Sequence, residues 1–272
     1  MTRLTSPDRV LWPEAGFTKR DAAGYYRGVW AALAPHVLDR PLTVFRFPEG
    51  VEGPRWYMTQ CRGGLRTRRV PARTGRPQDY CLVETLDDLL RLVNMGGLEL
   101  HPLLSRGPDV DRATHVVFDL DPGPPADVVA CVPVALAVRA AFPRALVKTS
   151  GSLGLHVFVP LDEPLPFAET KAVARDLARR LAHELEGVTD RPARTLRPGK
   201  VFVDWNQNDR TKSLVAPYSL RALPWPTVST PLAWEELERA RGAGDLLFLA
   251  GDVVERVRRS PPPWSPATPI RT

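Results

Sequence analysis

Cysteine is scarce in this chain of 272 residues, which contains only Cys61, Cys81 and Cys131 and no CxxC pair. We therefore expect neither a disulfide framework nor a zinc site, and we expect a reducing, cytoplasmic environment. Long hydrophobic runs are also missing, since the most apolar stretch, residues 128–138, is too short to span a bilayer. The opening MTRLTSPDRV lacks the apolar stretch of a signal peptide. These absences argue against a membrane partner.

The overall composition, with 43% hydrophobic and 25% charged residues, excludes collagen-like, coiled-coil and wholly disordered chains. A net charge of +6 suits a phosphate-rich partner. The sequence has no internal repeat and no long linker. We therefore expect one compact domain over residues 1–260, followed by a proline-rich tail over 261–272.

Apolar periodicity predicts helices, the first two of which begin after the capping residues Thr18 and Thr85. The helices are expected at residues 18–38, 85–95, 127–142, 167–186 and 234–241. Strands are expected at residues 41–47, 115–121, 145–149, 155–160, 201–205 and 214–220. Strands and helices alternate through the middle of the chain, which indicates a mixed α/β or α+β domain.

Two acids separated by one residue form the sharpest local feature, in the segment FDLDPG at residues 118–123. Because side chains alternate along a strand, Asp119 and Asp121 point to the same face. Two carboxylates this close repel each other, and they stay ionised only if a cation or water separates them. The Pro-Gly that follows suggests a sheet edge, where hard divalent cations find oxygen ligands. A solvated strand end before a turn is the alternative.

A third acid, Asp204, lies in the strand-like segment KVFVDW, where it shares a face with Phe202. Burying an unpaired charge on a strand costs several kcal/mol, so an acid at this position suggests a specific role. Three acids on two neighbouring strands form the standard cage for two metal ions about 4 Å apart, which clamp the oxygens of a phosphoryl transfer. We therefore expect Asp119, Asp121 and Asp204 to be metal ligands and catalytic acids.

The glycine-rich segment TSGSLGLH, residues 149–156, joins two expected strands. Its glycines allow a tight turn whose N–H groups can face an anion, and Ser150 adds a hydroxyl donor. His156 lies just past the turn, where it can donate to a phosphate oxygen. A plain hairpin with a buried structural histidine is the alternative.

Two arginines, Arg197 and Arg221, are candidates for holding triphosphate oxygens, because the guanidinium fork binds them bidentately. A surface position is the alternative for either one. His101, in LELHP, can orient a carboxylate or touch a substrate, and a structural role is the favoured alternative.

Taken in order, these segments resemble the polymerase domain of bacterial DNA ligase D, a branch of the archaeo-eukaryotic primase (primase-polymerase) superfamily. The resemblance extends from about residue 4 to residue 237. Its motifs are SPDRVLWPE, TK (18–19), RPLT, GLELHP, FDLDPG, KTSG, GLHV, KVFVDW, QN (207–208), Lys212 and APYSLR. It implies an α+β primase-polymerase fold with a mixed or antiparallel catalytic sheet flanked by helices. An N-terminal α/β portion would occupy about residues 1–100 and the catalytic core about residues 101–245.

The resemblance also assigns roles to individual positions. Asp119, Asp121 and Asp204 match the catalytic metal ligands of the family. Positions that hold the incoming nucleotide are matched by Arg46, Ser150, His156, Arg197, Gln207 and Arg221. His101 matches a histidine near the catalytic centre. Arg9 and Lys19 match a basic pair that receives the 5′-phosphate of the downstream DNA strand.

Three positions depart from the family pattern, because Leu153, Phe45 and Cys61 stand where the family has lysines. Fewer cations predict a weaker grip on template or nucleotide. The three acids are unaffected, so a change in substrate preference is expected before a loss of activity.

The implied function is template-dependent nucleotidyl transfer that extends primer 3′ ends at DNA gaps and breaks in non-homologous end joining. Two ions, Mn²⁺ or Mg²⁺ with manganese favoured, would be bound by the acids. The implied substrates are gapped or broken duplex DNA with a 5′-phosphate and ribo- or deoxynucleoside triphosphates, and ribonucleotides can be preferred through their 2′-hydroxyl. Ku and a DNA ligase are the implied partners, and the cytoplasmic nucleoid is the implied location. We expect a stand-alone form or an excised domain, since no ligase or nuclease module is present.

Three alternatives stay open from the sequence. A primase that starts chains de novo would use the same acids without a primer. A DNA-end-binding module would keep the basic pair and lose the chemistry, which the complete set of acids argues against. A metal-dependent phosphatase or nuclease also places acids at a strand end, but the motif of a covalent aspartyl intermediate is missing.

Overall fold

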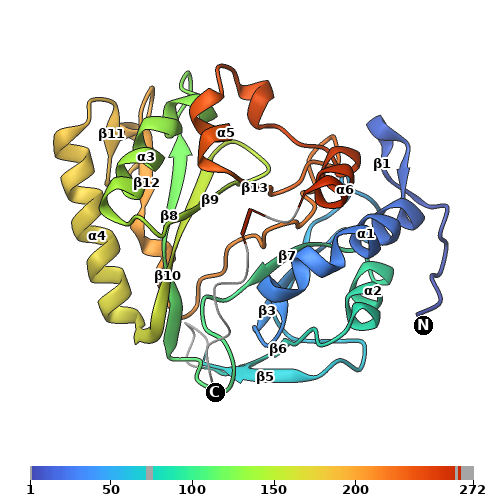
Figure 1. Ribbon diagram of the computed structural model, residues 1–272. Coiled ribbons are helices and arrows are strands. Elements are labelled where there is room, and N and C mark those ends of the chain that lie inside the picture. Colours follow the sequence, from blue (N-terminus) through green and yellow to red (C-terminus); the bar gives the residue numbers. More distant parts are fainter. Residues whose placement is uncertain (1, 72–75, 261–262, 265–272) are drawn as a thin grey trace. The chain divides into compact units, whose positions relative to one another are not determined.

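The computed structural model describes residues 2–71, 76–260 and 263–264 of the chain (Figure 1). It contains two compact units, and the chain visits each of them three times. The first unit comprises Met1–Val110, Ser213–Ser229 and Phe248–Pro262, and the second comprises Asp111–Lys212, Thr230–Leu247 and Pro263–Thr272. Each is described by itself below.

The first unit combines a five-stranded sheet with helices α1 (Lys19–Val37), α2 (Leu86–Asn94) and α6 (Ala250–Arg259). The sheet contains β3 (Leu42–Arg46), β4 (Trp56–Met58), β5 (Thr67–Val70), β6 (Gln78–Cys81) and β7 (Gly97–Pro102). Its strand order is β4-β3-β6-β5, and β7 also pairs with β3. A short hairpin, β1 (Val10–Trp12) and β2 (Phe17–Thr18), precedes α1.

Two capping boxes set the beginnings of α1 and α2, as the sequence predicts. The Thr18 side chain accepts from the N–H of Asp21, whose carboxylate accepts from the Thr18 N–H in return. Thr85 and Asp88 repeat this arrangement at α2. Each box satisfies backbone donors that a helix leaves unpaired at its first turn.

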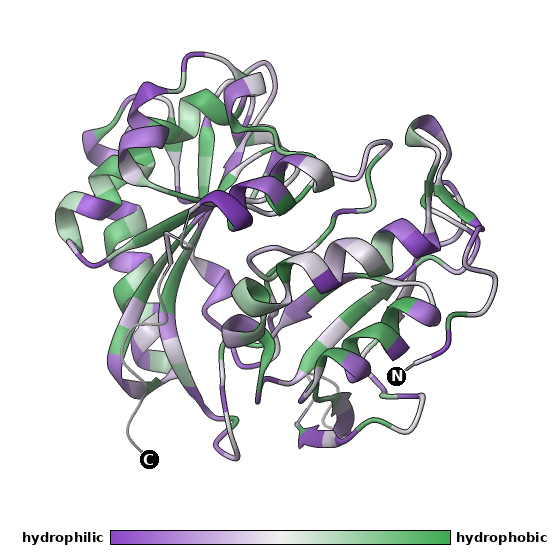
Figure 2. Cartoon of the chain, turned by 45° about the vertical axis from the view of Figure 1, so that its right-hand side comes forward, coloured by the Kyte–Doolittle hydropathy of each residue, from purple (hydrophilic) through white to green (hydrophobic). Residues whose placement is uncertain are grey.

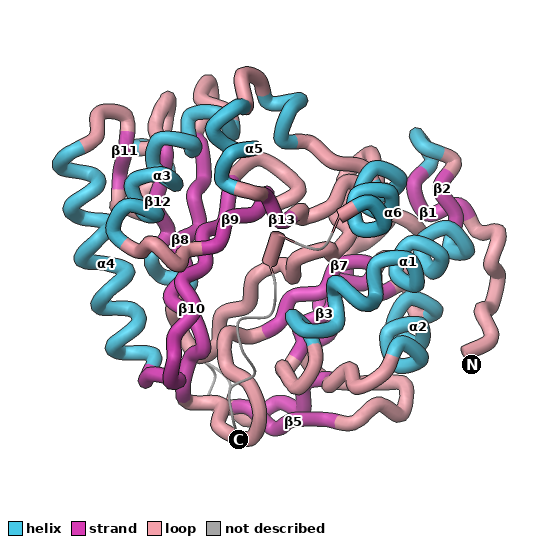
Figure 3. The backbone as a smooth tube through the Cα atoms, viewed as in Figure 1, coloured by secondary structure: helices cyan, strands magenta, loops and turns pink. Residues whose placement is uncertain are grey.

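The second unit is built on a six-stranded sheet with the order β11-β12-β8-β10-β9-β13. The strands are β8 (Arg112–Pro122), β9 (Leu146–Thr149), β10 (Leu155–Pro166), β11 (Val188–Thr189), β12 (Val201–Asp204) and β13 (Pro231–Leu232). Only the β11–β12 pair is parallel, so the sheet is mixed and mainly antiparallel. Helix α4 (Phe167–Glu184) contacts β8 and β10 (Figure 3), and α3 (Cys131–Ala141) and α5 (Trp234–Arg239) complete the unit. The α+β prediction is confirmed.

Hydrophobic colour follows the strands of both sheets in Figure 2, whereas the helices carry polar colour on part of their surface. In β8, the residues from Val116 to Leu120 are buried, including Asp119, which is 8% exposed. This strand is third in the order of the sheet. The expectation that the two acids lie at a sheet edge is therefore wrong, because β12 and β10 cover both edges of β8.

Three further expectations are corrected. Residues 214–220 form no strand, because Pro217 lacks an N–H donor and Tyr218 adopts a left-handed φ of 64°. The helix expected at 127–142 begins as a separate 3₁₀ turn, Val128–Ala130, before α3. Cys61 and Cys81 form a disulfide, because non-adjacent segments bring their Cα atoms to 4.7 Å.

The proline-rich tail falls mostly outside the described residues, but Trp264 belongs to the second unit. Its side chain is 4% exposed, and its indole N–H donates to the Val147 carbonyl at 3.1 Å. This residue is therefore anchored, contrary to the expectation of a loose end. None of the helices within the described residues has the length and apolar character needed to cross a membrane.

Candidate active site

A straight row of polar side chains crosses four adjacent strands of the second unit. Asp204 of β12 pairs in register with Asp119 of β8, Asp119 pairs with His156 of β10, and His156 pairs with Lys148 of β9. Residues paired across antiparallel strands project to the same face of the sheet, with Cβ atoms about 5 Å apart. Two of the predicted acids and the predicted histidine are therefore neighbours, as expected.

Hydrogen bonds connect the members of this row. The Lys148 Nζ lies 2.9 Å from His156 Nδ1, and His156 Nε2 lies 3.1 Å from Asp119 Oδ1. The Gln207 amide donates to Asp119 Oδ2 and to Asp204 Oδ2, at 3.2 Å each. Contacts therefore connect Lys148 through His156 to Asp119, and the Gln207 amide connects Asp119 to Asp204.

The third acid, Asp121, lies two residues further along β8, and its pKa is strongly raised. Burial raises its pKa to about 7, and the charges of Asp119 and Asp204 add to the increase, whereas Arg197 opposes it. Burial and Asp119 also raise the pKa of Asp204. Both shifts mean that the carboxylates gain stability when a positive charge joins them.

Arg197 lies beside the acids. Its guanidinium stacks on the Phe202 ring with Cζ 3.8 Å from the centroid, donates to the Pro192 carbonyl at 2.9 Å, and approaches Asp121 to 3.9 Å. Gly123 makes this approach possible, because a Cβ there would lie 2.0 Å from the Arg197 carbonyl oxygen. The Pro-Gly after the acids is thus required for packing.

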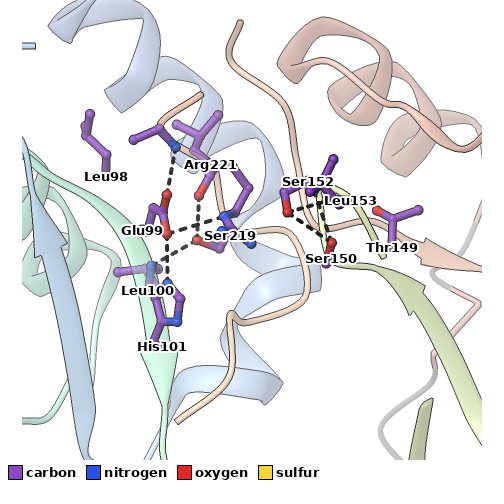
Figure 4. Close-up of polar contacts among 12 residues, drawn as sticks. Leu98, Glu99, Leu100, His101, Thr149, Ser150, Ser152, Leu153, Ser219 and Arg221 are labelled. Carbon is purple, nitrogen blue, oxygen red and sulfur yellow. Dashed lines mark hydrogen bonds and ion pairs between the residues drawn. The ribbon is translucent and has the colours of Figure 1, made fainter. Parts of the chain in front are cut away.

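The turn between β9 and β10 is closed by its own serine (Figure 4). The Ser150 hydroxyl accepts from the N–H groups of Ser152 at 3.2 Å and Gly154 at 3.0 Å. Gly154 has no room for a side chain, because a Cβ would meet the Leu120 carbonyl oxygen at 2.1 Å. An anion would compete with Ser150 for these N–H groups. Leu153, at the tip of this turn, is 70% exposed.

The first unit contains a second polar cluster, centred on Glu99 of β7 (Figure 4). The Glu99 carboxylate accepts from His101 at 2.9 Å and from the Ala222 N–H at 2.8 Å, and it lies 3.3 Å from Arg221 Nε. Burial opposes ionisation of Glu99, but the hydrogen bond from His101 and the charge of Arg221 outweigh it and lower its pKa to about 2. Glu99 therefore orients both His101 and Arg221.

Phe45 and Arg46 of β3 lie at the margin of this cluster. The Phe45 ring stacks on His101 with centroids 4.1 Å apart and planes at 17°. Arg46 donates through Nε to the Met95 carbonyl at 2.9 Å, and burial together with the charge of Arg62 lowers its pKa. The Phe45 ring thus covers one face of the His101 imidazole.

The predicted 5′-phosphate pair lies on the first unit near the start of α1. Lys19 is 6% exposed, and its Nζ donates to the carbonyls of Thr5 at 2.8 Å and Asn94 at 3.1 Å. Arg9 is exposed and donates to the Pro48 carbonyl at 2.8 Å. Burial lowers the pKa of Lys19, and the positive charge of Arg9 adds to the decrease.

Comparison with known proteins decides the family. The sequence matches the family described as "LigD, primase-polymerase domain" over residues 18–264. The chain belongs to the LigD primase-polymerase domain family. The predicted resemblance is thereby confirmed.

Relatives from several bacteria agree with this membership. The multifunctional non-homologous end joining protein LigD of Mycolicibacterium smegmatis is 36% identical over 246 residues, which cover 86% of this chain and 32% of that protein. The bifunctional LigD of Bacillus subtilis is 25% identical over 273 residues, covering 96% of this chain and 43% of that protein. The chain therefore spans about a third of the mycobacterial LigD length.

A solved structure, the polymerase domain of Mycobacterium tuberculosis ligase D in complex with DNA, has the same fold. It superimposes with a TM-score of 0.88 at 34% identity, and the match covers 95% of each chain. LigD primase-polymerase domains are metal-dependent nucleotidyltransferases.

The carboxylates of this LigD-family domain fit a divalent cation in their chemistry. Asp119, Asp121 and Asp204 offer oxygen ligands. Burial, together with the charge of Asp119, raises the pKa of Asp121 and of Asp204, and a cation would offset both effects. Within residues 2–71, 76–260 and 263–264, however, no three histidine, cysteine, aspartate or glutamate side chains converge as a ready-made metal site. The Gln207 amide stands between two of the acids, so a cation there would take its place.

Two charged residues, one in each of the two polar clusters, were not predicted from the sequence. Lys148 is fully buried at the end of the row, and Glu99 is 4% exposed at the centre of the other cluster. The available signal was an ionisable residue inside an otherwise apolar strand, LVKT or GLELHP.

Proposed function

We propose that this chain is a template-dependent nucleotidyltransferase, a DNA-directed DNA/RNA polymerase that extends primer 3′ ends at gaps and breaks during non-homologous end joining. One observation carries the proposal: Asp204, Asp119 and His156 share one row of a sheet in a chain of the LigD primase-polymerase family. Acids on adjacent strands are the arrangement that two-metal phosphoryl transfer requires.

In this proposal Asp119, Asp121 and Asp204 bind two divalent cations, Mn²⁺ in preference to Mg²⁺. When bound, these ions lower the pKa of the primer 3′-hydroxyl and stabilise the leaving pyrophosphate. Gln207 leaves its position between the carboxylates and turns to the nucleotide.

The remaining side chains hold the triphosphate and the DNA. His156 and Ser150 donate to phosphate oxygens, and Arg197 and Arg221 offset the charge that grows on them. Arg46 contacts the nucleotide, and His101, held by Glu99, supports the catalytic centre. The 5′-phosphate of the downstream strand binds to Arg9 and Lys19.

The names of two relatives support DNA and end joining as the setting in which this chain acts. LigD of M. smegmatis is a non-homologous end joining protein, and the M. tuberculosis polymerase domain was solved with DNA. We infer that gapped or broken duplex DNA and nucleoside triphosphates are the substrates, that Ku and a DNA ligase act with this chain, and that it works at the nucleoid in the cytoplasm.

The deciding experiment is a gap-filling assay with manganese on a 5′-phosphorylated gapped duplex, comparing ribo- and deoxynucleoside triphosphates. We expect extension by the nucleotide complementary to the template, and none when the primer is omitted. Extension without a primer would favour a de novo primase. DNA binding without any incorporation, in manganese or magnesium, would favour an end-binding module and overturn the proposal.

A further inference from the structure

Lys148 is a fully buried lysine in the middle of a sheet, with 0% of its surface exposed. Its Nζ lies 2.9 Å from His156 Nδ1, and it sits 5.8 Å from the centroid of the Phe158 ring. Removing an ammonium group from water costs several kcal/mol unless charged or polar groups compensate. The negative charges two and three strands away, reached through His156, provide that compensation.

The direction of the hydrogen bonds follows from the donors that each group carries. An ammonium group donates and cannot accept, so His156 Nδ1 must offer its lone pair to Lys148. The imidazole proton then resides on Nε2, where it is donated to Asp119 Oδ1 at 3.1 Å. The opposite tautomer would direct an N–H at the ammonium group and a lone pair at a carboxylate.

We propose that Lys148 is a positioning residue that holds His156 as the neutral Nε2–H tautomer. In that state Nε2 can donate to an anion but has no lone pair with which to bind a cation. His156 is therefore excluded from the metal ligands while it stays ready to donate to a nucleotide phosphate. The effect on nucleotide binding rests on the proposed function. The assignment of the tautomer does not depend on that function.

Asp119 supports the same tautomer, so the roles of the two neighbours must be separated. A cation on the Asp119 carboxylate would compete with Nε2–H for that acceptor, whereas Lys148 would still direct its donor at Nδ1. The variants D119A and D119A/K148M reproduce this situation without metal. If Lys148 were only a packing element, its replacement by a methionine of similar length would leave the tautomer unchanged.

The test is ¹⁵N NMR of the metal-free full chain at a pH of about 8, above the ordinary pKa of histidine. Long-range correlations distinguish protonated from unprotonated ring nitrogens, and an H156Q variant assigns the signals among the five histidines. We expect an unprotonated Nδ1 and a protonated Nε2 in the wild type and in D119A, and a mixture of tautomers in D119A/K148M. A protonated Nδ1 in the wild type, as either the other tautomer or an imidazolium, overturns the proposal even if a variant fails to fold. An unchanged single tautomer in folded D119A/K148M does the same.

Kinetics test the consequence for the reaction. K148M should raise KM for the nucleotide about tenfold, the loss expected for one hydrogen bond to a charged group, with a smaller effect on kcat. K148R, which keeps a donor, should restore part of the loss, and K171M serves as the matched control because Lys171 pairs with Asp209 outside the row. A K148M enzyme with unchanged KM contradicts the proposal. If the wild type incorporates no nucleotide, the proposed function fails while the NMR result still decides the tautomer.

Discussion

Asp119 and Asp204 face each other across adjacent antiparallel strands, with one amide hydrogen-bonded to both. Like charges directly opposite on a sheet are destabilising. The fold therefore keeps two opposing carboxylates at the position where the proposed function requires cation ligands.

The opposition of Asp119 and Asp204 predicts that removing one of the two charges raises stability and lowers activity. D204N removes one charge with almost no change of shape, so the metal-free domain should gain up to about 1 kcal/mol in free energy of unfolding. Incorporation should nevertheless fall at least a hundredfold, because the amide is a poor cation ligand, while DNA binding persists. Urea unfolding and the gap-filling assay measure the two effects. The control is D209N, which breaks an ion pair with Lys171 and should not stabilise the domain. A D204N protein that is active, or less stable than the wild type, would refute the assignment.

Glu99 predicts a loss of stability in acid. Its folded-state pKa of about 2 lies below its ordinary value of 4.5. A group with a lowered folded-state pKa stabilises the protein above the ordinary pKa, and this stability is lost as the pH falls from about 4.5 to 2. The shift corresponds to about 3 kcal/mol. Unfolding of the wild type and E99Q in urea between pH 7 and pH 3 should show the difference between them shrinking toward acid. The exposed E84Q variant is the control, and a pH-independent difference would contradict the prediction.

The basic pair predicts a preference for phosphorylated ends. The wild type should bind a 5′-phosphorylated gap at least tenfold more tightly than an unphosphorylated one, because each hydrogen bond to a charged group contributes about 1.5–3 kcal/mol. The R9Q/K19M variant should bind the two gaps equally. The slope of log affinity against log salt should fall by about 2 when two phosphate contacts are removed. R20Q is the matched control, because Arg20 neighbours Lys19 on α1 but pairs with Asp8. A wild type indifferent to the phosphate would remove the proposed role.

The Cys61–Cys81 disulfide predicts that stability depends on the redox state. The bond closes a loop with a sequence separation of 20, and a loop of this size is worth about 3 kcal/mol. Reduction should therefore lower the free energy of unfolding of the wild type and leave C61S/C81S unaffected, measured by urea unfolding with and without dithiothreitol. C131S controls for the buried free cysteine and should keep the full reduction effect. A wild type equally stable in both states would show that the two thiols are not joined.

Much of the secondary structure could be predicted from local sequence patterns. The capping boxes at Thr18 and Thr85 were predictable because each involves residues only three positions apart. The common face of Asp119 and Asp121 followed from strand alternation alone. In contrast, the segment 214–220 looked like a strand, but it has no extended partner among the described residues, only isolated bridges at Ser213 and Leu220.

The buried charges depend on partners that are distant along the chain. Glu99 meets His101 two residues away but depends on Arg221 and Ala222, which follow more than a hundred residues later. Cys61 and Cys81 likewise have no spacing signature, because a loop residue meets the end of β6, where the Cys61 N–H donates to the Asp79 carbonyl. Partners this distant along the chain leave no periodic signal.

The amino-acid sequence by itself determined the residue types of the site, the elements that carry them and the family to which the chain belongs. Only the tertiary structure decided which carboxylates oppose each other, that Gln207 lies between two of them, and that a buried lysine directs the proton of His156. Strand order and register are set by burial of apolar side chains over the whole sheet, so the contacts across strands are a property of the folded chain and not of any segment in it.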